Sequence, residues 1–155
     1  MTLLRLLHLL ALLWMMVGIG AVVVPIWRAW ATTDLPRRVV LLTEAQHNET
    51  QWLLPGVIAT GVTGFAWAAG ADMNLIRTGW LAAKEIVYAL DVFLFLPLTG
   101  VGLRRVRFLA LQAEKRGEVT EELRDALADN VPLVFGTVMA LSVPVLVVLA
   151  VFKPF

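Results

Sequence analysis

Four ionisable side chains lie within otherwise apolar stretches of this sequence, and they are its first candidates for chemistry. They are His8, Lys84, Glu85 and Asp91. A charged side chain is costly at bilayer depth, so its presence there indicates a function. Tyr88 falls between Lys84 and Asp91 at i+4, which places these three on one helix face, with Glu85 about 100° round. A neutral imidazole can bind a metal, and carboxylates and amines can move protons.

Helix geometry predicts how deep these residues lie. His8 follows Arg5 by three residues, or about 4–5 Å, and Lys84 follows Trp80 by four, or about 6 Å. We therefore expect His8 and Lys84 at a similar depth in the outer half of the membrane, where they can converge on one site. Asp91 is about 10 Å deeper, near the midplane, and needs a partner or a proton there. Two plainer interpretations stay open: Lys84 extends to the interface, and His8 makes an ordinary interhelical hydrogen bond.

Several kinds of function are excluded. The sequence has no cysteine, which excludes disulfides, cysteine-bound iron–sulfur clusters and thiol catalysis. It has no phosphate-binding glycine loop, nucleophile elbow or HExxH motif, so a soluble type of hydrolase or kinase is excluded. A net charge of +1 gives no reason to expect a nucleic-acid partner. His47, beside Glu44 and Glu49, is predicted to be solvated loop surface.

The composition is that of a membrane protein. Hydrophobic residues make up 59% and charged residues 16% of the chain, whereas a soluble domain carries about 25% charged residues. A span needs roughly 20 mostly apolar residues, and four stretches qualify: Leu6–Val24, Trp52–Ala71, Leu75–Leu103 and Val131–Phe152. The first is too long for the apolar region of a typical signal peptide, so we expect it to be retained. The predicted fold is all-α: a single membrane domain, residues 1–155, built as a four-helix bundle.

Charge predicts the orientation. Nine basic residues fall in the two longer loops, 28–51 and 104–130, and three flank the other side. By the positive-inside rule these loops are cytoplasmic and both termini are outside. Both loops are expected to be helical. Asp34 and Pro36 begin an interfacial helix, and a hairpin extends the third span, turns at Gly117 and restarts at Thr120.

Gly56, Thr60 and Gly64 recur at i, i+4 and i+8 in the second stretch. Small residues at this spacing let membrane helices approach closely. An alternative interpretation is a flat surface on which a planar macrocycle lies. Kinks are expected at Pro55 and Pro144.

Short motifs along most of the chain resemble those of the HemJ family of four-helix membrane proteins. They resemble equally those of a related family of bacterial predicted integral membrane proteins. The motifs are Leu-Leu-His8 with Gly18 ten residues on, Leu54-Pro55-Gly56, Thr78-Gly79-Trp80-Leu81 followed by Lys84, Asn130-Val131-Pro132, and a terminal Lys153-Pro154-Phe155.

The resemblance to HemJ-type protoporphyrinogen oxidases implies a haem b held by His8, with Lys84 as the second required residue. It further implies oxidation of protoporphyrinogen IX and transfer of electrons to quinone. Lys84 would bind iron or pair with a propionate, and Glu85 or Asp91 would accept protons. The alternative is a non-catalytic accessory or assembly subunit of a respiratory or photosynthetic complex, with Gly56, Thr60 and Gly64 against another protein. Either way we expect a multi-pass protein of the bacterial inner membrane in contact with lipid, and leave a homo-oligomer open.

Overall fold

The computed structural model describes residues 2–71, 73 and 77–153, and the regular structure in these residues is entirely helical. Four of the helical segments are long and apolar enough to cross a membrane. In chain order the elements are α1 (Thr2–Ala31); α2 (Leu35–Asn48), the π-helical turn η1 (Glu49–Leu53) and α3 (Leu54–Gly70); α4 (Gly79–Leu90), the π-helical turn η2 (Asp91–Phe95) and α5 (Leu96–Arg116); and α6 (Glu121–Ala128) followed by α7 (Val131–Phe152). The predicted all-α, four-helix membrane fold is confirmed.

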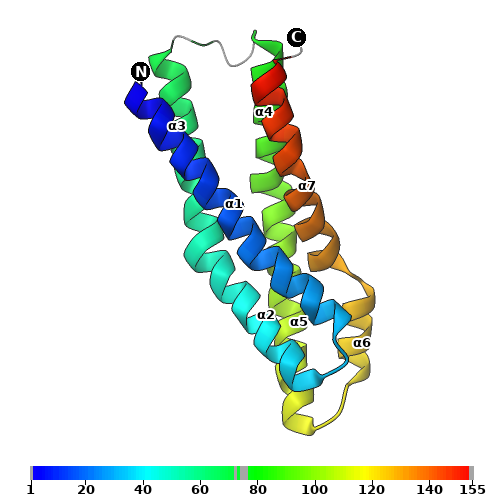
Figure 1. The fold of residues 1–155 in the computed structure, drawn as a ribbon. Coiled ribbons are helices and arrows are strands. Elements are labelled where there is room, and N and C mark those ends of the chain that lie inside the picture. Colours follow the sequence, from blue (N-terminus) through cyan, green and yellow to red (C-terminus); the bar gives the residue numbers. More distant parts are fainter. Residues whose placement is uncertain (1, 72, 74–76, 154–155) are drawn as a thin grey trace.

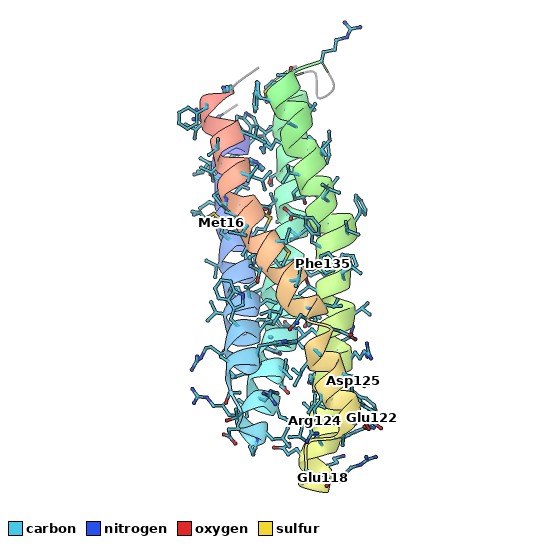
Figure 2. All side chains as sticks on the ribbon, turned by 90° about the vertical axis from the view of Figure 1, so that its right-hand side faces the viewer. Met16, Glu118, Glu122, Arg124, Asp125 and Phe135 are labelled. Carbon is cyan, nitrogen blue, oxygen red and sulfur yellow. The ribbon has the colours of Figure 1, made fainter. Side chains whose placement is uncertain are left out.

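The four segments run antiparallel, so that both described ends of the chain lie at one end of the bundle (Figure 1). The last turn of α3 and the first turn of α4 lie at this same end, and α2, α6 and the second half of α5 form the opposite end. Charged side chains such as Glu118, Glu122, Arg124 and Asp125 gather at the opposite end, whereas Met16 and Phe135 lie along the apolar length (Figure 2). The arrangement agrees with two termini on one side; which side faces the cytoplasm stays a prediction.

Helices continue well beyond the predicted spans. The segment 28–51, treated as a loop, is largely the end of α1 and the whole of α2, and α2 begins after Asp34 with Pro36 in its first turn, as predicted. In the hairpin, Gly117 adopts a left-handed φ of 73°, and the Leu123 amide donates to the Thr120 hydroxyl at 3.3 Å. Both turn predictions are confirmed. The predicted start of the third span at Leu75 lies outside the described residues.

Each π-helical turn comes just before a Leu-Pro pair. In η1 and η2, the amides of Leu54 and Leu96 donate to the carbonyls of Glu49 and Asp91, five residues back. The proline that follows has no amide hydrogen and crowds the preceding turn, and the wider turn relieves that crowding. The irregularity found at Pro55 is therefore this turn, while a kink at Pro144, inside α7, stays a prediction.

Glycines let α1 pack directly on the second segment. A Cβ added at Gly18 would lie 2.7 Å from Leu53 Cα, and one at Gly56 would lie 3.0 Å from Met15 Cα. One at Gly64 would lie 3.0 Å from the His8 ring. The predicted close-packing role of Gly56 and Gly64 is confirmed. At Gly56 the alternatives, a flat surface for a macrocycle or a contact with another protein, are wrong, because the backbone of α1 covers it, whereas Gly64 packs against the His8 ring and also borders a cavity.

Candidate functional site

A cavity of about 230 Å³ opens between two helix pairs near the chain ends. In this half of the bundle α1 packs on α3 and α4 packs on α7, and the two pairs diverge (Figure 1). The polar and aromatic side chains that line the cavity are Arg5, His8, Trp67, Trp80, Lys84, Glu85 and Lys153. A narrow extension of about 20 Å³ runs deeper, past Tyr88 and Thr60. His8, Lys84 and Glu85 line both spaces, so they lie at the junction.

His8 is the most buried of these cavity-lining polar residues, with 3% of its surface exposed. Its ring packs against Gly64 and lies 5.7 Å, centroid to centroid, from Trp67. Gly64 is required here because a larger side chain on α3 would occupy the position of the imidazole. The helix pair α1–α3 therefore positions the ring.

Hydrogen bonding determines which His8 nitrogen carries the proton. The Thr63 hydroxyl has one hydrogen, and it donates that hydrogen to the Ala59 carbonyl at 2.6 Å. The hydroxyl oxygen then accepts from His8 Nδ1 at 3.2 Å, so Nδ1 bears the hydrogen in the neutral ring. This leaves Nε2 with a free lone pair, and Nε2 is buried without a hydrogen-bond partner. An imidazole fixed through Nδ1 with a bare Nε2 is the form in which histidine binds metals.

The structure brings together His8 and three predicted neighbours on α4. Lys84 and Glu85 are partly buried and line the cavity opposite α1, and Lys84 also borders a third space of about 80 Å³ beside α7. Tyr88, one turn deeper, donates to the Val57 carbonyl at 2.7 Å and packs against Gly61, which ties α4 to α3. The shared cavity agrees with the matched depth inferred for His8 and Lys84. Their roles in binding or catalysis stay predictions.

Asp91 lies away from this group. It begins η2, two turns beyond Lys84, and contacts α7: the Ser142 hydroxyl lies 2.6 Å from Asp91 Oδ2. Only 7% of the Asp91 surface is exposed, and Oδ1 is buried without a partner. Asp91 thus has a buried polar partner, one of the two possibilities that the sequence predicted, but Ser142 is not among the residues that line the cavity.

In the described part of the chain, no three His, Cys, Asp or Glu side chains cluster closely enough to hold a metal ion. A single imidazole can still serve where a cofactor supplies the other ligands of the metal. His47 is exposed, as predicted for loop surface.

A family model described as predicted integral membrane protein, DUF2269, matches residues 2–154. The chain belongs to this family. Neither the curated proteins nor the solved structures include a match to it. Membership in DUF2269, together with four candidate spans, makes the protein an integral membrane protein in contact with the lipid bilayer.

Glu49 and Ser142 are among the buried polar residues of this DUF2269 member that the sequence did not predict. Glu49 falls in a predicted cytoplasmic loop, yet it is 7% exposed, packs its carboxylate against Gly100 and lies 3.6 Å from Arg104. Ser142 was overlooked as a hydroxyl in an apolar helix. A signal for Glu49 was available: it precedes Pro55 by six residues, the same spacing that separates Asp91 from Pro97. Both acids open a π-helical turn that precedes a Leu-Pro pair.

Proposed function

We propose that this membrane protein binds a haem b between its two helix pairs, where His8 Nε2 would hold the iron, and that it acts as an oxidoreductase. The observation that carries the proposal is the state of His8. The ring is buried and oriented by Thr63, and its ligand nitrogen is unprotonated and has no partner. Leaving a buried polar atom unpaired costs about 1–3 kcal/mol, a cost that a bound metal would remove.

The surroundings suit an anionic, planar group. Lys84 can pair with a propionate or, when neutral, act as a second ligand. Arg5 and Lys153 add two further cations at the cavity, and Lys153 Nζ lies 5.1 Å from the Trp80 ring centroid. Trp67 and Trp80 supply aromatic surface. Haem b, when bound, would supply one-electron chemistry, and Glu85 is the cavity-lining carboxylate available to accept a proton.

The size of the cavity places a further requirement on how the fold would hold a haem. The cavity of about 230 Å³ is smaller than the roughly 300–1,000 Å³ of pockets that enclose a drug-sized ligand. A tetrapyrrole would therefore either widen the gap between the α1–α3 and α4–α7 pairs or extend an edge into lipid. Of the described α3–α4 contacts, the Tyr88 bridge lies deeper than the main cavity, so the outer ends can separate while the bridge holds.

The experiment is an absorption spectrum of the protein purified from cells supplied with haem. We expect a Soret band in the wild-type protein and its loss in His8→Ala. The matched control is His47→Ala, which removes the other histidine of the sequence from an exposed position and should keep the band. A colourless wild-type protein, or a His8→Ala variant with an unchanged spectrum, would refute the proposal and leave the accessory-subunit hypothesis to be tested.

Lys84 variants separate its two proposed roles. Lys84→Ala should weaken haem binding, and Lys84→Arg should restore it only if the residue pairs with a propionate, since guanidinium stays protonated and cannot bind iron. The resemblance to HemJ-type enzymes makes protoporphyrinogen IX the first substrate to assay, with a quinone as electron acceptor.

A further inference from the structure

Asp91 and Ser142 form a buried pair in the middle of the bundle that the haem proposal does not use. The Ser142 oxygen lies 2.6 Å from Asp91 Oδ2 and 2.7 Å from the Met139 carbonyl oxygen. Both distances are those of hydrogen bonds. The Ser142 oxygen thus makes two short contacts, one with Asp91 and one with Met139. Where the hydrogens lie in these contacts depends on the protonation state of Asp91.

The number of available hydrogens distinguishes a protonated Asp91 from an ionised one. A serine hydroxyl has one hydrogen, and a backbone carbonyl can only accept. If Ser142 donates to Met139, the usual bond from a serine to its own helix, then the short contact with Asp91 needs a hydrogen from the carboxyl group. An ionised Asp91 would satisfy one contact and leave two oxygens 2.7 Å apart with no hydrogen between them. The protonated acid satisfies both.

The burial of Asp91 also favours its protonated form. Asp91 Oδ1 has no hydrogen-bond partner and the side chain is 7% exposed. An unpaired oxygen costs far more on a carboxylate than on a neutral acid. The elements packed on η2 are α4, α5 and α7. On α4 the ionisable residues are Tyr88, Glu85 and Lys84, and the Lys84 cation lies seven residues, or about 10 Å, before Asp91 along the helix. On α7 no residue is ionisable, and the first cation of α5 is Arg104, thirteen residues or about 20 Å along the helix.

We propose that Asp91 is a proton-binding site of this protein, neutral at rest, which exchanges its proton with the outer cavity through Tyr88 and Glu85. On release, the proton leaves Asp91 Oδ2 and Ser142 turns its hydrogen from the Met139 carbonyl to the new carboxylate. Uptake reverses both movements.

The surroundings of Asp91 give the direction of exchange. Toward the chain ends, Tyr88 lies one turn away and borders the narrow extension, and Glu85 lies two turns away and borders both the extension and the cavity. Toward the hairpin end, the next turns of α7 and α5 bring Met139 and Leu96, which are 1% and 7% exposed. Hydroxyl and carboxyl groups can pass a proton and these apolar side chains cannot. The buried Thr99 hydroxyl on α5 also lies toward the hairpin end, but at eight residues, or about 12 Å along the helix, it is farther from Asp91 than Tyr88 and Glu85, so the route connects Asp91 to the cavity.

The test is infrared spectroscopy of the protein in lipid nanodiscs without added haem, so its result is independent of the proposed function. The wild-type spectrum minus that of Asp91→Asn should contain the carbonyl stretch of a protonated carboxylic acid. Ser142→Ala should move this band to higher frequency, because the acid loses its hydrogen-bond partner. Asp129→Asn, at an exposed position, is the control and should leave the band unchanged.

A difference spectrum with carboxylate bands alone would overturn the proposal. The route has its own readout, the rate at which the acid band shifts after transfer to D₂O. Tyr88→Phe should slow this shift several-fold, while Ile86→Val, on the exposed side of α4, should not. An unchanged rate in Tyr88→Phe would overturn the route through Tyr88.

Discussion

Gly18 and Gly20 offer a direct test of how α1 packs on the second segment, because the two glycines lie two residues apart in one helix. A Cβ at Gly18 would lie 2.7 Å from Leu53 Cα and 2.9 Å from Leu53 N. At Gly20 a Cβ would meet nothing within 4 Å. We therefore expect Gly18→Ala to destabilise the protein and Gly20→Ala to be neutral or stabilising.

The difference in stability between the two variants can be estimated from these distances. Ordinary van der Waals contact begins near 3.4 Å, so the Gly18→Ala variant must separate α1 from η1 by about 0.7 Å or distort both. Overpacking of this kind costs about 1–3 kcal/mol. Alanine also gains about 1 kcal/mol of helix propensity over glycine, but this gain is common to both variants and cancels. Gly18→Ala should thus be about 1–3 kcal/mol less stable than Gly20→Ala.

The assay is reversible unfolding in mixed detergent micelles, followed by far-ultraviolet circular dichroism, with the free energy of unfolding extracted for each variant. The contact at stake is with backbone atoms of Leu53, which cannot rotate away as a side chain could. Stabilities that agree within about 0.5 kcal/mol, the usual spread for neutral surface changes, would refute the packing described for α1 and η1.

Three further predictions concern other parts of the molecule. Gly64→Leu should lower thermal stability more than Gly70→Leu. A Cβ at Gly64 would lie 3.0 Å from the buried His8 ring, whereas one at Gly70 would lie 3.3 Å from the flexible end of Leu4. Equal melting temperatures in detergent would contradict this prediction. Thr63→Val removes the acceptor that orients His8 and should weaken haem binding about 10–100-fold, as titration would measure, with no change expected under a purely structural role for His8. A reporter fused to the C-terminus should be active only outside the cytoplasm, and cytoplasmic activity would reverse the orientation inferred from nine basic residues against three.

The sequence alone was enough for the spans and for the positions of the polar residues along their helices. Each span has to satisfy its backbone within itself and present apolar side chains to lipid, so hydropathy and length reveal it locally. Depth is also local, because each residue advances a helix by 1.5 Å. His8 and Lys84 could therefore be assigned to one level of the membrane before any contact between their helices was known.

Only the tertiary structure decided which side chains meet. The bare Nε2 of His8 depends on Thr63, 55 residues away, and the partner of Asp91 is Ser142, 51 residues away. The burial of Glu49 depends on Gly100 of another segment. Such pairs depend on the rotation of each helix about its axis, and one extra residue in a π-helical turn changes that rotation by about 100°. Rotation is set by packing between segments distant in the chain, so a single helix read by itself cannot determine it.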